Sequence, residues 1–338
     1  LAAAHGGYTA VCPMPNLSPT PDCPAHLEEE LAAIRRDACI HIHPYGTITR
    51  GQQGEELADL EGIAQNVVAF SDDGRGVQSP DMMRKAMMVA KKLDKIIAAH
   101  CEDNTLLHGG YIHDGEYARL HGHKGICSQS EWGQIERDIQ LVRETGCAYH
   151  VCHVSTKESV DMVRQSRRRG AMVSCEVTPH HLWFTNDTCD YRVNPPIRTA
   201  DDVQALVDGI RSGIVDAIAT DHAPHSEEDK LKGMAGMVGS ETAFGVCYTK
   251  LCKQEDLPLE VLVHLMSTRP AEILGLAKGQ LEPGYDADFV LVDLDTPYTV
   301  DKDKLHSKSH NTPFDGVELY GKVCATIKGG KITYQAEE

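Results

Sequence analysis

The chain has 338 residues, enough to bury a large core as one α/β unit or as a large domain with a small one. It carries 33 Lys and Arg residues against 50 Asp and Glu, a formal net charge of -17, so its long-range field repels nucleic acids and anionic membranes. No apolar run approaches the roughly 20 residues that cross a bilayer, and the first residues lack the features of a secretion signal. We therefore expect a cytoplasmic protein without nucleic-acid or membrane partners.

The twelve cysteines are scattered along the chain, several of them inside apolar strand-like runs. None form the paired CxxC clusters of a structural zinc site. This distribution favours buried thiols in a reducing compartment.

Short apolar or β-branched runs recur along the chain, and helical patterns such as HLEEELAAIRRD, PDMMRKAMMVAKKLD, SEWGQIERDIQLVRETG and TKESVDMVRQSRRRG lie between them. This alternation is typical of βα units around a parallel sheet. Seven runs qualify as strands: 8–14, 38–43, 67–70, 95–100, 148–153, 172–177 and 217–220.

Polar or ionisable residues follow strand after strand, at the edge where catalytic groups gather in a (β/α)8 barrel. They are Asn16, Asp72, Asp73, His100, His153, His180 and Asp221. We therefore predict an α/β fold of the (β/α)8 TIM-like barrel type. Such a barrel has eight strands and the chain opens in a helix-like AAAHGG, so we expect the first strand to lie upstream of residue 1.

The pattern changes near the C-terminus, where ADFVLVDLD and YGKVCATIKGGKITYQ read as strands joined by a hairpin turn at Gly329 and Gly330. We predict a hydrolase barrel over residues 1–275 and part of a small β-domain over 276–338, the other part lying upstream. The longest loop-like segment, 103–129, is rich in His and Gly, and long loops at a barrel mouth are often functional.

The segments FSDDG, AAHCED, YHVCHVST and ATDHAPH each place a metal-competent side chain just past a strand. Two histidines with carboxylates are ligands that suit zinc. A single histidine at a strand end is more often structural. Their recurrence in strand order instead favours one shared metal site.

In chain order, GGYTAVCPMPN, VVAFSDDG, AHCEDN, YHVCHVSTKES, EVTPHHL, VNPPIR, ATDHAPH and SKSHNTPFDG resemble the bacterial-type dihydroorotases of the amidohydrolase superfamily. The resemblance covers nearly the whole chain. It implies a centre of one or two zinc ions at the mouth of the barrel. Carried over residue by residue, the implied ligands are Asp73, His100, His153 and Asp221.

The resemblance also implies an HxH pair on the first strand, before GGYTAVCPMPN. The only local candidate, HIHPYG, follows that segment, so we interpret His41 and His43 as structural. The missing pair leaves two interpretations open: a truncated enzyme, which we favour, or a homologue that has lost its metal site.

Hydantoinases, allantoinases and another dihydroorotase type use a carboxylated lysine where this chain has Asp72 and Asp73. Strand alternation puts Asp73 on one face with the small Ala69 and Ser71, and Asp72 on the other with the bulky Phe70. We expect Asp73 to be the ligand.

The implied reaction is the reversible, zinc-dependent hydrolysis of L-dihydroorotate to N-carbamoyl-L-aspartate in de novo pyrimidine biosynthesis. Asp221 is then the catalytic base that passes a proton to the leaving ring nitrogen. The resemblance assigns Asn16, Asn194 and His225 to substrate binding. Asn194 of NPP and Asn311 of NTPF are the softer assignments, because turn formation explains both equally well.

His180 and His181 lie near the mouth but match no ligand position, and we interpret His222 as structural. For the long loop we favour solvated histidines, with a weak adventitious metal site as the alternative; these are His108, His113, His121 and His123. Two rival functions stay open: another cyclic amidase acting on hydantoins or allantoin, and a catalytically silent homologue that scaffolds aspartate transcarbamoylase. A homodimer is a further expectation from the resemblance.

Overall fold

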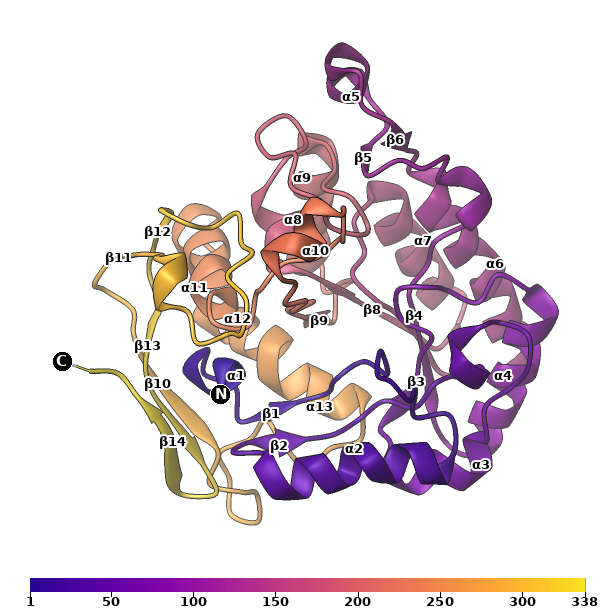
Figure 1. Ribbon diagram of the computed structural model, residues 1–338, viewed down its shortest axis with the longest axis horizontal. Helices are drawn as coiled ribbons and strands as arrows, with labels where there is room; N and C mark the ends of the chain where they lie inside the picture. Colours follow the sequence, from indigo (N-terminus) through magenta and orange to yellow (C-terminus); the bar gives the residue numbers. More distant parts are fainter. Residues whose placement is uncertain (338) are drawn as a thin grey trace.

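A ring of parallel strands surrounded by helices forms the body of the computed structural model, which describes residues 1–337 (Figure 1). All seven runs predicted as strands are strands, which confirms that part of the prediction. They are β1 Ala10–Val11, β2 His41–Ile42, β3 Ala69–Phe70, β4 Ile96–Ala99, β7 Tyr149–Val151, β8 Val173–Val177 and β9 Ala217–Ile218.

The strands pair in the order in which they occur along the chain. β1 pairs with β2, and the continuous sheet β3-β4-β7-β8-β9 is parallel throughout. A parallel bridge between Gly46 and Phe70 joins the segment after β2 to β3. Among the described residues no pairing joins β9 to β1, so the ring is open between these two strands. Parallel neighbours place their carboxyl ends at one edge, and that edge carries the site described below.

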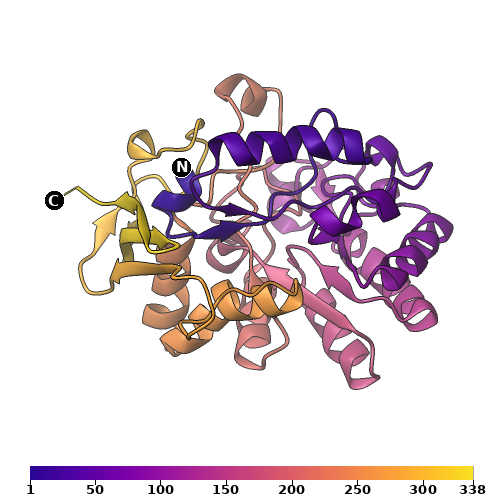
Figure 2. The same cartoon turned by 90° about the horizontal axis from the view of Figure 1, so that it is seen from below.

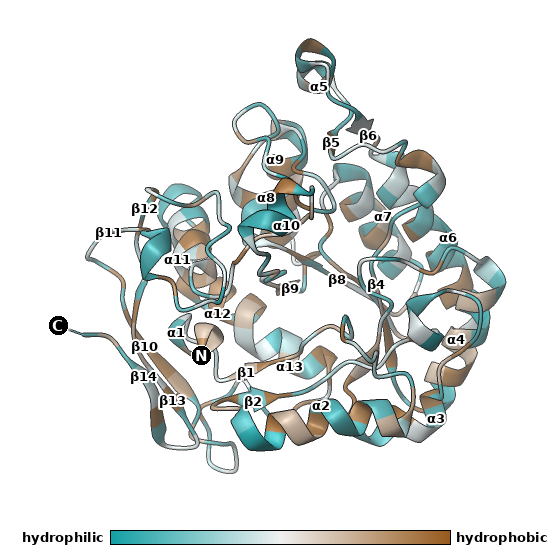
Figure 3. Cartoon of the chain, viewed as in Figure 1, coloured by the Kyte–Doolittle hydropathy of each residue, from teal (hydrophilic) through white to brown (hydrophobic). Residues whose placement is uncertain are grey.

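The longer helices cover the outside of the ring with an apolar face. In α4 (Pro80–Lys92) the buried residues Met83, Ala86, Met87 and Ala90 recur at helical spacing. Figure 3 shows the mixed hydropathy of these helices, and Figure 2 shows them flanking the strands in a second view. None of the helices in residues 1–337 is long and apolar enough to cross a membrane.

The remaining helices connect strands or cover the ring. They are α1 Ala2–His5, α2 Pro24–Asp37, α3 Leu60–Ile63, α5 Glu116–His121, α6 Gln129–Thr145, α7 Lys157–Arg168, α8 Pro179–Trp183, α9 Ala200–Arg211, α10 Glu227–Leu231, α11 Ala243–Cys247, α12 Leu259–Val263 and α13 Arg269–Ile273. Short 3₁₀ turns are η1 Arg50–Gln52, η2 Ala64–Asn66, η3 Asn104–Leu106 and η6 Lys302–Lys304, and π turns are η4 Tyr248–Gln254 and η5 His264–Thr268.

A small antiparallel sheet lies beside the ring, next to both ends of the chain (Figure 1). It consists of β10 Phe289–Asp293, β13 Lys322–Lys328 and β14 Lys331–Gln335, and a separate pair is formed by β11 Tyr298–Thr299 and β12 Glu318–Leu319. The predicted hairpin turn is present, with φ of 56° at Gly329 and 75° at Gly330. Both values suit a two-residue hairpin turn that requires positive φ twice. The domain boundary at residue 275 stays a prediction.

The segment 103–129 is more ordered than the loop-like pattern indicated. It contains β5 Ile112–His113 and β6 Gly125–Ile126, which pair in parallel and flank α5. This segment, called the arm below, projects from the body of the molecule (Figure 1). Sequence patterns missed it because two-residue strands carry no measurable periodicity.

A buried carboxyl group links α6 to the sheet. The hydroxyl of Tyr149 on β7 donates to Asp138 Oδ2 at 2.8 Å, and Arg137 Nε donates to Asp138 Oδ1 at 2.8 Å. Burial raises the pKa of Asp138 to about 6, although Arg137 and Tyr149 oppose the rise.

The folding stability of Asp138→Asn, relative to that of the unchanged chain, should increase as pH rises. The folded chain binds this proton more tightly than an unfolded chain, where an aspartate has a pKa of about 3.9. Folding stability contributed by Asp138 therefore falls between about pH 4 and about pH 6, by up to roughly 3 kcal/mol, and the variant lacks this loss. Unfolding midpoints over this pH range test it, with the exposed Glu136→Gln on the same helix as the control. A difference between variant and unchanged chain that does not vary with pH would contradict the assignment.

Candidate metal centre

Three side chains converge at the carboxyl ends of neighbouring strands. Asp73 follows β3, His100 follows β4 and His153 follows β7, and their ligand atoms all lie within 4.8 Å of one another. His100 Nδ1 is 2.9 Å from His153 Nε2, and Asp73 Oδ1 is 4.0 Å and 3.8 Å from these two nitrogens. Both imidazoles are buried.

These three residues fit a metal ion. Ligands about 2.0–2.1 Å from a tetrahedral zinc ion stand about 3.3 Å apart, close to the spacing of the three donor atoms. Two imidazoles and one carboxylate also match the donor types of zinc and of other borderline divalent ions.

The electrostatics of the group favour a cation. Burial lowers the pKa of His153, but the carboxylates of Asp73 and Asp221 outweigh burial and raise the pKa to about 9. At Asp73 burial acts to raise the pKa, but His153 and His100 outweigh burial and bring the pKa down to about 2. The carboxylates therefore hold a positive charge at this point of the barrel mouth.

Asp221 lies after β9, outside the three-residue group but close enough to interact with its charges. Burial raises the pKa of Asp221 to about 7, His153 opposes the rise, and Asp73 adds to it. The backbone φ is 46° at Asp221 and 36° at His153, in the left-handed region that side chains disfavour. Such residues cost on the order of 1–3 kcal/mol each and cluster at functional sites.

Asp72 and Asp73 have different surroundings although they are adjacent. Asp72 Oδ1 accepts hydrogen bonds from Ile48 N at 2.9 Å and Thr49 N at 3.1 Å, and Asp72 Oδ2 accepts one from the Thr49 hydroxyl. Asp72 thus holds the segment after β2, and Asp73 lies with His100 and His153.

The comparisons with known proteins agree with this geometry. A family model described as Dihydro-orotase-like matches residues 1–159, and one described as Amidohydrolase family matches residues 148–334. A dihydroorotase from Fusobacterium nucleatum subsp. nucleatum is 47% identical over 100% of this chain and 81% of that protein, and one from Geobacillus sp. is 46% identical over 99% and 81%. The chain belongs to the dihydroorotase family of amidohydrolases.

Solved structures of related amidohydrolases confirm the predicted α/β barrel class. L-Hydantoinase (dihydropyrimidinase) from Arthrobacter aurescens matches with a TM-score of 0.89 and 26% identity, over 100% of this chain and 79% of that one. Dihydropyrimidinase from Brevibacillus agri matches with a TM-score of 0.86 and 20% identity, over 99% and 78%. The family is metal-dependent, in agreement with the three-residue group.

Two of the expected substrate-binding residues lie beside the expected ligands. Asn16 Nδ2 donates to Asp73 Oδ2 at 2.8 Å. Asn194 Nδ2 donates to Glu102 Oε2 at 3.0 Å, and the same oxygen is 3.5 Å from His100 Nε2. Both asparagines are therefore linked to a ligand, directly or through Glu102.

His225 lies in a loop held by the NTPF segment. Its backbone N–H donates to Asn311 Oδ1 at 3.2 Å, and Asn311 Nδ2 donates to the carbonyls of Ala223 and Gly236 at 3.2 Å each. Asn311 thus supports the loop that carries His225.

Three histidines outside the predicted ligand set have partners other than Asp73, His100 and His153. His41 Nε2 is 3.2 Å from Asp288 Oδ2, in a cluster where Lys278 already donates to Asp288 at 2.9 Å. His222 Nδ1 accepts hydrogen bonds from two backbone N–H groups, and His181 hydrogen-bonds Thr178 and the carbonyl of Pro195.

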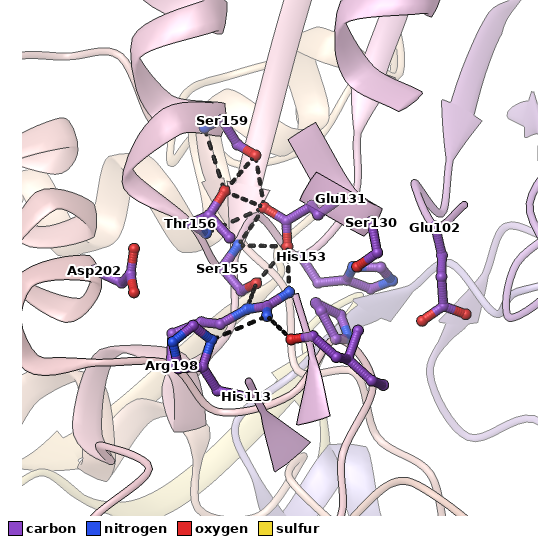
Figure 4. Close-up of polar contacts among 12 residues, drawn as sticks. Glu102, His113, Ser130, Glu131, His153, Ser155, Thr156, Ser159, Arg198 and Asp202 are labelled. Carbon is purple, nitrogen blue, oxygen red and sulfur yellow. Dashed lines mark hydrogen bonds and ion pairs between the residues drawn. The ribbon is translucent and has the colours of Figure 1, made fainter. Parts of the chain in front are cut away.

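The sequence pattern missed a buried polar network behind His153, drawn in Figure 4. Its members include Glu131 on α6 and Arg198, four residues after Asn194. Both were part of the sequence segments quoted above, yet no local signal marks a buried charge. His113, expected to be solvated, is buried, and its Nδ1 lies 3.3 Å from Arg198 Nη1, so that expectation was wrong.

Replacing the two neighbouring aspartates should separate metal binding from folding. Asp73→Ala removes a predicted ligand and should lower the metal content by elemental analysis. Asp72→Ala leaves two buried backbone N–H groups unpaired, at about 1–3 kcal/mol each, and should lower the unfolding midpoint of the metal-free chain without removing that ligand. If Asp72→Ala alone lost the metal, the assignment of the ligand would be reversed.

Proposed function

We propose that this chain catalyses the reversible hydrolysis of L-dihydroorotate to N-carbamoyl-L-aspartate, a step of de novo pyrimidine biosynthesis, with one or two zinc ions at the barrel mouth. The observation that carries the proposal is the buried group of Asp73, His100 and His153, in a chain 44% to 47% identical over almost its whole length to proteins named dihydroorotase. Family membership makes it a cyclic amidohydrolase.

The predicted site residues have different roles according to where they lie. Asp73, His100 and His153, together with Asp221, hold the metal, which when bound supplies hydroxide at neutral pH and polarises the amide carbonyl. The carboxylate of Asp221 takes up the proton of the attacking water and delivers it to the ring nitrogen that leaves.

Asn16, Asn194 and His225 bind the substrate and fix its orientation. Asn194 uses an N–H on Glu102, and because an amide group has two N–H donors and a carbonyl, it keeps polar atoms for the substrate ring. Asn16 likewise divides its amide between Asp73 and the side chain of Gln52. The asparagines thus connect the substrate to the groups that hold the metal.

The rival functions fit the site less well. A cyclic amidase with a carboxylated lysine would carry a lysine where Asp73 lies. A silent scaffold has no need of buried ligand side chains, because burying ionisable groups costs folding free energy. We also propose that the protein forms a homodimer.

Asp221→Asn should lower kcat for L-dihydroorotate by about 10²- to 10⁴-fold, the usual loss when a general base is removed. The measurement is turnover with L-dihydroorotate, hydantoin and allantoin side by side, on the full-length gene product, with zinc determined in the same samples. The unchanged protein should hold one to two zinc ions and prefer L-dihydroorotate.

The matched control is Asp208→Asn, an exposed aspartate on helix α9, which should keep full activity. If the full-length protein binds zinc but turns over hydantoin or allantoin faster than L-dihydroorotate, the proposed substrate is wrong. A metal-free, inactive full-length protein would favour the scaffold.

A further inference from the structure

Glu131 is a buried carboxylate that contacts no proposed ligand, yet it makes more hydrogen bonds than a helix side chain usually does. Only 3% of its surface is exposed. Figure 4 shows its carboxylate surrounded by the turn that follows His153. It accepts hydrogen bonds from Ser155 N at 3.1 Å, Thr156 N at 3.1 Å, Thr156 Oγ1 at 3.0 Å and Ser159 Oγ at 2.7 Å, and from the Ser155 hydroxyl.

These bonds fix the backbone directly after the strained residue. His153 has a φ of 36°, and its neighbours two and three positions later are both held by Glu131. A disfavoured backbone conformation persists only when the surrounding structure determines it. Glu131 provides that constraint from a different helix, α6.

Arg198 balances the buried negative charge. Its guanidinium is 2% exposed, with Nη2 at 3.9 Å from Glu131 Oε2 and Nε donating to Ser155 Oγ at 3.0 Å. Burial lowers the pKa of Arg198, and the charges of Glu131 and Asp202 oppose this. Removing either charge would leave the other buried and unpaired, which is strongly unfavourable.

Arg198 also joins two further segments to the His153 turn. Its Nη1 donates to the carbonyl of Ile126 at 3.0 Å and lies 3.3 Å from His113 Nδ1, both at the base of the arm. Arg198 is therefore in contact with the arm, the His153 turn and α6 at once.

Helix capping accounts for only part of these contacts. The helix α7, which follows the turn, has its own cap, in which Thr156 Oγ1 accepts from Ser159 N at 3.3 Å. The bonds of Glu131 to Ser155 lie before the helix begins, on the side of His153.

We propose that Glu131 is a positioning residue for His153. Its carboxylate holds the turn so that His153 Nε2 faces Asp73 and His100, and the neighbouring guanidinium of Arg198 helps to hold that carboxylate in place. The inference rests on the proposed metal centre, because it concerns how one ligand is aimed. In metalloenzymes the residues that orient the ligands typically change metal affinity about 10- to 100-fold when replaced.

The test compares Glu131→Gln and Ser155→Ala with the control Glu136→Gln, which lies on the same helix but is exposed. The first readout is the rate at which bound zinc is released to a chelator, and the second is the visible spectrum of the cobalt-substituted protein, which reports ligand geometry. We expect about 10- to 100-fold faster zinc release in Glu131→Gln. Ser155→Ala should show a smaller increase, and both variants should show an altered cobalt spectrum.

The unfolding midpoint of each metal-free chain separates positioning from stability. If both variants lower this midpoint but release zinc at the rate of the control with an unchanged cobalt spectrum, the positioning role is overturned. Should Glu131→Gln fail to fold, Ser155→Ala decides alone, since it removes only two hydrogen bonds of the turn. If the unchanged full-length protein itself retains no zinc, the metal centre fails first and this role falls with it.

Discussion

A charged group taken out of water must find a partner of opposite charge or several hydrogen bonds, and the barrel mouth of this chain depends on that requirement. Asp73 is satisfied by Asn16 and by the two histidines, Asp72 by backbone and hydroxyl groups, and Glu131 by the His153 turn. In each case the partners lie in segments of the chain other than the one that carries the carboxylate. The carboxylates therefore fix the relative positions of the elements as well as their own, which allows a metal ion and a substrate to meet preorganised groups.

Two residues at the barrel mouth have strained backbone conformations. His153 and Asp221 both have positive φ shortly after their strands. This backbone conformation changes the direction of their side chains from the one that a continuing strand would impose. The hydrogen bonds of Glu131 explain how the strain is held at His153. At Asp221 the following residue is fixed instead, because His222 Nδ1 accepts the N–H groups of Gly239 and Ser240.

The strands and the outline of the site could be predicted because both leave local signals. The strand runs carry β-branched periodicity, and alternation along one strand distinguishes the surroundings of Asp72 from those of Asp73. The network behind His153 could not be predicted in the same way. Glu131 and Ser155 are separated by 24 residues and Arg198 and Ser155 by 43, and a buried charge pair follows from the folded positions of its members. The arm was missed because its two strands are only two residues long, and they are held by their pairing with each other and by contacts with the distant Arg198.

The segment from Asn194 to Arg198 contacts the surroundings of both His100 and His153. At one end Asn194 binds Glu102, whose carboxylate lies beside the ring nitrogen of His100 that faces away from His153. At the other end Arg198 binds Ser155 in the turn after His153. A carboxylate next to the outer nitrogen of a ligating histidine is a common way to fix its orientation and raise its basicity. Because Asn194 and Arg198 are only four residues apart, a displacement of this one segment would alter the hydrogen bonds around both histidines.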